Sequence, residues 1–235
     1  MIFELLSFGE TGWGDNLLRG AGVTAVLAVL SFGLGLPIGL LGAGAKLSDN
    51  RALRGIADVY TTVFRGVPEL LVIYLFFFGS SQAIMKVAGI FGYTGYLELP
   101  PFLVGVLAVG VISGAYSTEV FRGAILAVPR GQIEAGMAMG MRPRLIFRRI
   151  TLPQLLRFAL PGLGNVWQLT LKDTALVSVT SLAELMRTAQ VASGSTREPF
   201  LFYVTAALLY LVMTSISQGL FQAAERHYDR GVRRA

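Results

Sequence analysis

Long apolar runs alternate with short charged segments along this chain. Residues 20–45 and 199–224 each contain 26 consecutive residues without Asp, Glu, Lys or Arg, and residues 99–118 contain 20 such residues. A helix needs about 20 mainly apolar residues to cross the hydrocarbon core of a bilayer. These three runs therefore predict three membrane-spanning helices.

Two further apolar runs are shorter and adjoin charges. Residues 70–85 are uncharged but follow Arg65 and Glu69, and residues 158–171 lead into Lys172. Each run crosses a bilayer only if helical turns from its flanks extend it, at about 1.5 Å per residue. We therefore expect five spans in a single all-α integral membrane domain that covers the whole chain, residues 1–235. The expected spans are about 17–45, 58–85, 99–126, 152–180 and 199–225.

Composition agrees with a membrane location. The chain has 235 residues, of which 54% are hydrophobic and only 14% are charged, whereas charged residues make up about 25% of a typical soluble domain. The first 16 residues contain Glu4, Glu10 and Asp15 but no basic residue, so we do not expect a cleaved signal peptide. Cysteine is absent and His227 is the single histidine. We find no constellation of a catalytic nucleophile, base or metal ligands, so neither a catalytic nor a metal site is expected.

The basic residues favour one orientation. If the first connecting loop lies in the cytoplasm, most Lys and Arg residues near the spans also lie there, as the positive-inside rule requires. These residues are Lys46, Arg51, Arg54, Arg130, Arg142, Arg144, Arg148, Arg149, Arg226, Arg230, Arg233 and Arg234. The main exceptions on the outer side are Arg19, Lys86, Arg187 and Arg197. We expect an outer amino terminus and a cytoplasmic carboxyl terminus, and we attribute the net charge of +6 to topology and to affinity for the anionic inner leaflet.

A basic segment rich in Gly and Pro separates the third and fourth expected spans. Its sequence from residue 131 is GQIEAGMAMGMRPRLIFRRITLP. Residues 131–138 form two helical turns in our interpretation, and Gly140 permits the left-handed turn that ends such a helix. Residues 144–150 form a second short helix, and Pro153 begins the next span. We call residues 130–152 the elbow. A rigid elbow could transmit force from a partner; the alternative is an ordinary loop that holds the inner leaflet through its arginines.

The elbow resembles the EAA loop of permease subunits in bacterial ATP-binding cassette (ABC) importers. That loop has the pattern Glu-Ala-Ala, three residues, Gly, nine residues, Ile, one residue, Leu-Pro. The matching residues here are Glu134, Ala135, Gly140, Ile150, Leu152 and Pro153. Gly136 replaces the second alanine, which should loosen the short helix by about 0.5–1 kcal/mol while keeping the docking face small. The resemblance implies that these seven positions couple the chain to an ATPase.

The resemblance covers nearly the whole chain. RGVPELLVIYLFFFG, AYSTEVFRGAILAVPRGQIEAG and LKDTALVSV are similar to the polar amino acid permease family. With KLSDNR and ERHYDRGVRRA, the chain is similar to the Q-type permeases of histidine, lysine-arginine-ornithine, octopine and nopaline importers, which have the type I ABC importer fold.

The family implies a set of partners. They are an M-type permease in a heterodimer, two ATPase subunits that bind ATP and Mg, a periplasmic binding protein, and a polar or basic amino acid or opine carried across the bacterial inner membrane. The chain itself then needs no cofactor. The alternative is an ATP-independent secondary transporter or channel, which would not require the elbow and would usually show two related halves.

Ionisable residues within the interrupted spans are candidates for the substrate pathway. Arg65 and Glu69 lie one turn apart if the helix continues through Pro68, so they either pair with each other or take part in gating or substrate contact. Asp173, beside Lys172, is placed in the outer half of the bilayer by its distance from Pro153 and would suit a cationic substrate.

Five other residues are secondary pathway candidates. They are Tyr116, Asn165, Trp167, Gln168 and Thr174. The last four could line the pathway, but polar contacts between helices, which membrane bundles commonly use, are the favoured interpretation for them. Glu119 and Arg122 suit a cytoplasmic brace, and residues 181–193 suggest an amphipathic helix on the outer surface.

Overall fold

The computed structural model describes residues 2–9, 12–90, 92, 95, 99–180 and 182–229, and these residues form helices joined by short connections. The elements are α1 (Ile2–Leu5), α2 (Gly14–Lys46), α3 (Arg51–Gly66), α4 (Glu69–Ile90), α5 (Pro101–Ala127), α6 (Arg130–Ala138), α7 (Pro143–Ile146), the π-helix η1 (Phe147–Thr151), α8 (Leu152–Asp173), the 3-10 helix η2 (Thr174–Thr180), α9 (Leu185–Thr196) and α10 (Pro199–Tyr228).

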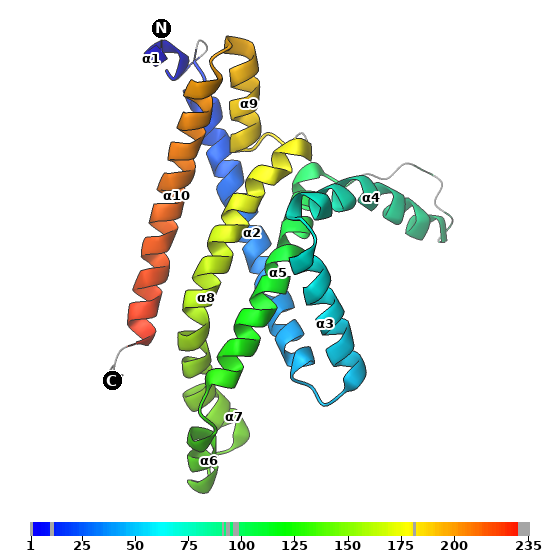
Figure 1. Ribbon diagram of the computed structural model, residues 1–235, viewed down its shortest axis with the longest axis vertical. Helices are drawn as coiled ribbons and strands as arrows, with labels where there is room; N and C mark the ends of the chain where they lie inside the picture. Colours follow the sequence, from blue (N-terminus) through cyan, green and yellow to red (C-terminus); the bar gives the residue numbers. More distant parts are fainter. Residues whose placement is uncertain are drawn as a thin grey trace.

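Helix α5 lies at the centre of the bundle and packs along α2 and α8 (Figure 1). Small residues allow the close approach of α2 and α5: a Cβ added at Gly35 would lie 2.7 Å from Ser113 Oγ, and one added at Gly39 would lie 2.5 Å from Ser117 Cβ. Lipid tails are as apolar as side chains, so membrane helices associate through close packing of small residues. The α2–α5 pair is therefore the core on which the other helices assemble.

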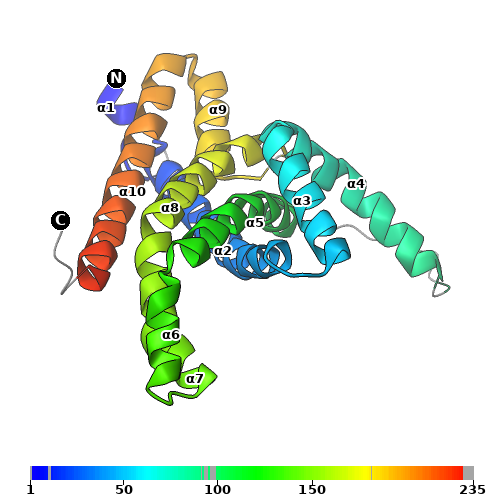
Figure 2. The ribbon, with the colours of Figure 1, turned by 60° about the horizontal axis from the view of Figure 1, so that its bottom comes forward.

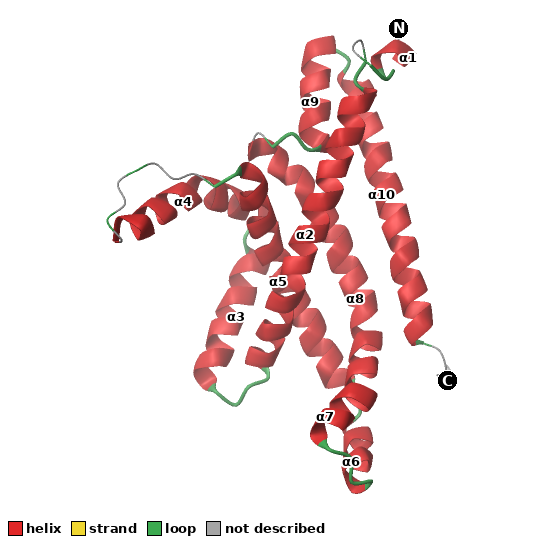
Figure 3. Cartoon of the chain, turned by 180° about the vertical axis from the view of Figure 1, so that it is seen from behind, coloured by secondary structure: helices red, strands yellow, loops and turns green. Residues whose placement is uncertain are grey.

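Among the described residues, four helices are long and apolar enough to cross a membrane: α2, α4, α5 and α10. Helix α8, at the expected fourth span, is less apolar because it contains Gln154, Arg157, Asn165 and Gln168. It nevertheless lies along α5 and contacts α10, so the bundle shields much of its length (Figure 3).

The expected second span at 58–85 is wrong as a single helix. The chain leaves the helical conformation at Val67, with φ −94° and ψ 138°, and α4 begins two residues later. Pro68 causes this break, because its ring disfavours the helical region for the residue before it. Helix α4 consequently turns sideways, away from the bundle (Figures 1 and 2).

Helix α9 occurs close to where an amphipathic helix was expected, but its apolar face is not free to lie on a membrane surface. Leu185, Ala189 and Ala192 are fully buried in a cluster with Leu17 of α2 and Phe202 of α10. The helix runs beside α10 (Figure 1). It is thus part of the bundle, because small residues on one face allow two neighbours to approach it.

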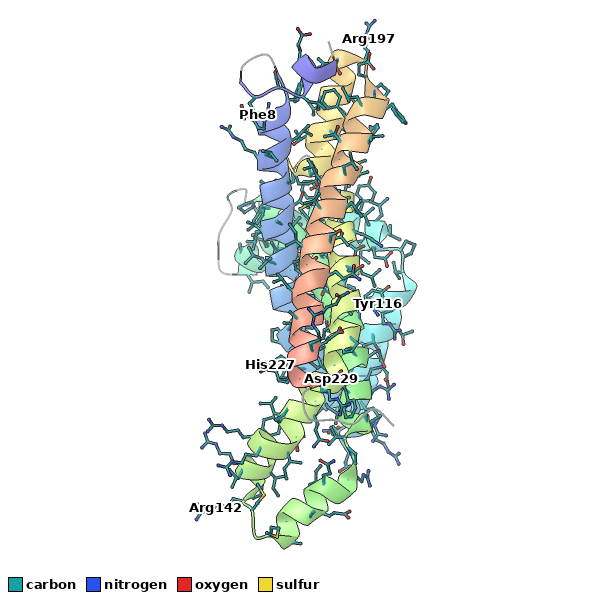
Figure 4. All side chains as sticks on the ribbon, turned by 90° about the vertical axis from the view of Figure 1, so that its left-hand side faces the viewer. Phe8, Tyr116, Arg142, Arg197, His227 and Asp229 are labelled. Carbon is teal, nitrogen blue, oxygen red and sulfur yellow. The ribbon has the colours of Figure 1, made fainter. Side chains whose placement is uncertain are left out.

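The two ends of the bundle differ in what they carry. Phe8 and Arg197 lie at one end, whereas Arg142, His227 and Asp229 lie toward the other (Figure 4). We call these the N-terminal end and the elbow end. The residues around Phe8 and the end of α10 therefore lie at opposite ends of the bundle.

Candidate functional site

The first arm of the elbow is α6, which ends in a hydrogen-bonded left-handed turn. Gly140 has φ +73°, and its N–H donates to the carbonyl of Met137 at 2.9 Å. The N–H of Met141 donates to the carbonyl of Gly136 at 3.1 Å. These two bonds form a Schellman motif, which satisfies carbonyls at the helix end. The predicted left-handed turn at Gly140 is confirmed.

The second arm runs without a break into the bundle. Helix α7 is followed by the π turn of η1, where the N–H of Leu152 donates to the carbonyl of Phe147, and then directly by α8. The π turn lies immediately before Pro153, which has no N–H to donate and whose ring crowds the carbonyl four residues earlier. Pro153 lies in the first turn of α8, as predicted, and the π turn before it joins α7 and α8 into one continuous rod.

The inner faces of the two arms pack together at Gly136. This residue is buried, and a Cβ added there would lie 2.9 Å from Ile150 Cδ1 and 3.3 Å from Ile146 Cγ1. Gln154 Nε2 also donates to Gln132 Oε1 at 2.7 Å. The expectation that Gly136 forms part of a small docking face is therefore corrected: it faces the other arm, where a glycine lets the two helices close.

The outer face of the elbow combines apolar and positive side chains. Glu134 and Ala135 are exposed, as are Met139 (83%) and Phe147 (52%). A groove of about 690 Å³ is lined by Arg142, Arg144, Leu145, Phe147, Arg148 and Leu152. Within the described part of the chain, no ion pair involves these arginines. Arg142 lies near the tip (Figure 4). An exposed surface of this kind marks an interaction site rather than internal packing.

Arg65 and Glu69 do not pair with each other, because the break at Val67 separates them. The Tyr116 hydroxyl donates to Glu69 Oε1 at 3.1 Å. The Arg65 guanidinium lies 5.6 Å from the Tyr116 ring centroid, and its Nη1 is 3.9 Å from Glu119 Oε1. The interpretation in which the two residues simply neutralise each other is wrong. Glu69 and Arg65 instead both contact Tyr116: Glu69 accepts the hydrogen bond from its hydroxyl, and Arg65 lies over its ring.

Glu119 is the centre of a charge cluster that joins α2, α3 and α5. Lys46 Nζ lies 2.6 Å from Glu119 Oε1 and 3.0 Å from Asp58 Oδ1. Arg122 Nε lies 2.9 Å from Glu119 Oε2, which confirms the predicted pair. The approach of Lys46 and Asp58 to Glu119 was not predictable from the sequence, because it depends on the fold of the α2–α3 hairpin.

Asp173 approaches the Glu69–Tyr116 pair from the end of α8. It is partly buried and close enough to both residues for their charges to interact. Three predicted pathway residues thus converge from α4, α5 and α8. We call Glu69, Tyr116 and Asp173 the acidic cluster. Two carboxylates beside a phenol form a setting that suits a positively charged group.

Lys172 and Gln168 lie on another side of α8. They line a groove of about 690 Å³ together with Tyr203 and Tyr210 of α10. The groove places Gln168 away from the acidic cluster, because neighbouring positions on a helix face different directions. Lys172 also lines the groove but stays close enough to Asp173 for their charges to interact.

The remaining candidates on α8 and η2 are placed in different surroundings. Thr174 is fully buried, donates to the carbonyl of Leu171 at 2.7 Å and lies 3.4 Å from the Tyr210 hydroxyl. The Trp167 ring packs on Phe32 with centroids 5.5 Å apart. Asn165 is exposed. For Thr174 and Trp167, these contacts favour the interpretation as helix-to-helix packing.

The sequence analysis missed Glu184, which is fully buried. Its carboxylate accepts hydrogen bonds from the N–H groups of Met186 and Arg187 at 2.9 and 2.6 Å, and so caps α9. The hydroxyls of Thr24 and Tyr210 also donate to it, at 3.2 and 3.3 Å. Glu184 therefore ties α2, α9 and α10 together. The signal available in the sequence was a single carboxylate, Glu184, with apolar residues directly before and after it.

Comparison with known proteins places this geometry in a family. Residues 35–230 match the family described as binding-protein-dependent transport system inner membrane component. The chain belongs to this family. It is 55% identical over 231 residues to the octopine transport system permease protein OccQ of Rhizobium radiobacter, with 98% of each chain covered. It is also 46% identical over 224 residues to the histidine/lysine/arginine/ornithine transport system permease protein HisQ of Escherichia coli strain K12, covering 95% of this chain and 98% of HisQ.

Solved structures support the same family fold. A crystal structure of an amino acid ABC transporter with histidines superposes with a TM-score of 0.77 at 32% identity, covering 92% of this chain and 95% of that one. An inward-facing structure of the methionine ABC transporter MetNI has a TM-score of 0.73 at 18% identity, which indicates a shared fold. The expected all-α type I importer fold is confirmed, and this chain is a multi-pass inner-membrane permease subunit rather than an enzyme.

Proposed function

We propose that this chain is the Q-type permease of an ATP-driven importer for basic amino acids or opines. It pairs with an M-type permease, receives substrate from a periplasmic binding protein and docks on two ATPase subunits. ATP and Mg bind to those subunits, and this chain holds no cofactor of its own. Its amino terminus is periplasmic and its carboxyl terminus cytoplasmic. The relatives that transport octopine or histidine, lysine, arginine and ornithine support this assignment.

The elbow is the observation that carries the proposed coupling. Its two arms are locked by the Schellman turn and by packing at Gly136, and it projects beyond the rest of the bundle (Figure 2). Met139 and Phe147 are exposed on it together with five exposed arginines. A rigid projection with an apolar and basic surface suits docking on a soluble partner. A flexible loop could not transmit a displacement.

Both arms lead directly to the acidic cluster. The first arm joins α5, which carries Tyr116, through Val128 and Pro129 alone. The second arm continues into α8, which ends at Asp173, about 33 Å away at 1.5 Å per residue. Movement of the elbow by an ATPase therefore shifts α5 and α8, two of the three helices that form the cluster. Nucleotide binding changes the transport state only through its difference in affinity for the two arrangements.

The acidic cluster supports the proposed substrate class. Glu69 and Asp173 place two carboxylates near each other, while Arg65 is drawn toward Tyr116 and Glu119. The ammonium or guanidinium group of a basic amino acid would compensate these charges. The carboxylate oxygens of the amino acid or opine would then be bound elsewhere in the pathway or by the partner permease.

Single cysteines test this proposal directly, because the natural sequence has none. In the intact complex, Glu134→Cys should cross-link to a cysteine in the ATPase subunit, whereas Ser193→Cys should not. An impermeant thiol reagent applied from the periplasm should label Ser193→Cys and leave Arg142→Cys unlabelled. Reversed labelling would refute the orientation. Transport by this chain without any ATPase subunit would favour the secondary transporter.

A further inference from the structure

Two arginines from distant parts of the sequence line one hollow at the N-terminal end. The hollow lies between α2 and α9, has a volume of about 320 Å³, and is lined by Trp13, Asn16, Arg19, Arg187, Thr188 and Val191 among others. Arg19 and Arg187 are both exceptions to the positive-inside pattern. The proposed coupling and substrate pathway do not use them.

Neither arginine has an acidic partner in the described part of the chain. The acidic residues next to them in sequence are engaged otherwise: Asp15 accepts a hydrogen bond from the N–H of Gly9, and Glu184 caps α9. Two guanidinium groups that share a hollow without a counter-charge repel each other. An anion bound between them would relieve this repulsion.

The depth of the hollow points to a particular kind of anion. The hydrocarbon core is about 30 Å thick, or about 20 helical residues. Counted back along α10 from Glu225, the first charge after its apolar run, this distance reaches about residue 205. Leu185 packs in the same buried cluster as Ala206, so Arg187 lies near the boundary between hydrocarbon and headgroups. Trp13 at the hollow agrees with this level, because tryptophan is enriched at membrane interfaces.

We propose that this hollow binds the phosphate of a phospholipid in the leaflet at the N-terminal end. Arginine offers a planar pair of donors that matches a phosphate oxygen pair. Asn16 is exposed at the same hollow and supplies a further donor, while Trp13 and Val191 provide apolar walls for the glycerol and the start of the acyl chains. A carboxylate of a partner protein would have to enter the layer of lipid headgroups to bind in this hollow. A lipid phosphate already lies in that layer and is therefore the better-matched occupant.

Native mass spectrometry of the detergent-purified whole importer complex tests the lipid site. The complex is delipidated and titrated with phosphatidylglycerol or phosphatidylethanolamine. The double variant Arg19→Gln/Arg187→Gln should bind each lipid much more weakly, by roughly fivefold for each arginine removed. Arg197→Gln, an arginine at the same end but outside the hollow, should bind as the natural protein does. Equal lipid binding by the double variant and the Arg197→Gln control would overturn the site.

Two further measurements separate the lipid from other anions. The variant Arg19→Lys/Arg187→Lys keeps both charges but loses the planar donor pairs, so it should bind lipid more tightly than the glutamine variant and more weakly than the natural protein. An unchanged unfolding temperature of the glutamine variant excludes misfolding as the cause of the loss. Inorganic phosphate at the same concentration should not displace the lipid, and displacement would show a simple anion site instead. If the glutamine variant lost affinity for the periplasmic binding protein while lipid binding was unchanged, the hollow would be a protein docking site and the proposal would fail.

Discussion

Proline interrupts the helices of this protein in two regions with opposite results. At Val67–Pro68 the chain breaks between α3 and α4, and the flanking Arg65 and Glu69 turn toward Tyr116 and Glu119 inside the bundle. In the elbow, between Pro129 and Pro153, the flanking arginines point outward and meet no acid among the described residues.

A proline that interrupts a helix does not by itself determine the role of the charged residues beside it. Their role depends on whether neighbouring helices surround them. Side chains at the α3–α4 break face α5 and the end of α8, so their charges are shared within the bundle. No helix of the described part of the chain covers the outer face of the elbow, so its charges are available to a partner.

The largest effect is expected in the elbow, from Gly140→Val. A β-branched residue at φ +73° is strained by about 1–2 kcal/mol, although no atom lies within 4 Å of the added Cβ. The turn should open, and amino acid uptake by reconstituted complexes should fall by more than about tenfold while ATP hydrolysis continues. Gly131→Val, in the same helix with ordinary backbone geometry, is the control. Full uptake with Gly140→Val would count against rigid coupling.

The next effect concerns the acidic cluster. Asp173→Asn removes one of its two carboxylates, so uptake of arginine should fall about tenfold relative to uptake of a neutral amino acid. Competition uptake assays with both substrates give this ratio directly. Asp229→Asn removes a carboxylate that pairs with Arg157 at the elbow end and should leave the ratio unchanged. Equal losses for both substrates after Asp173→Asn would indicate a folding defect.

The smallest effect compares the stability contributed by each region. Glu119→Gln removes the charge that Lys46 and Arg122 share, and should destabilise the protein by about 1 kcal/mol. Arg142→Gln in the elbow should change stability by less than about 0.5 kcal/mol, since nothing in the described chain pairs with it. Thermal unfolding of the purified complexes measures both. A larger cost for Arg142→Gln would reverse the contrast drawn between the two regions.

Much of the elbow was predictable because its structure is local. Gly140 is suited to a left-handed turn in nearly any context, and the spacing from Glu134 to Pro153 lies within one short segment. The local sequence did not predict which way Gly136 faces, because that depends on the positions of Ile146 and Ile150 in the second arm.

The amino-acid sequence by itself determined the membrane setting, the three longest spans and the helical turn of the elbow, because apolar run length and glycine conformation act over a few residues. Tertiary structure alone decided that Arg65 lies by Tyr116 and Glu119 and not by Glu69, that Glu184 is buried between α2 and α10, and that Arg19 and Arg187 line one hollow. These arrangements bring together residues up to 168 positions apart in the sequence, and they depend on how whole helices pack against one another.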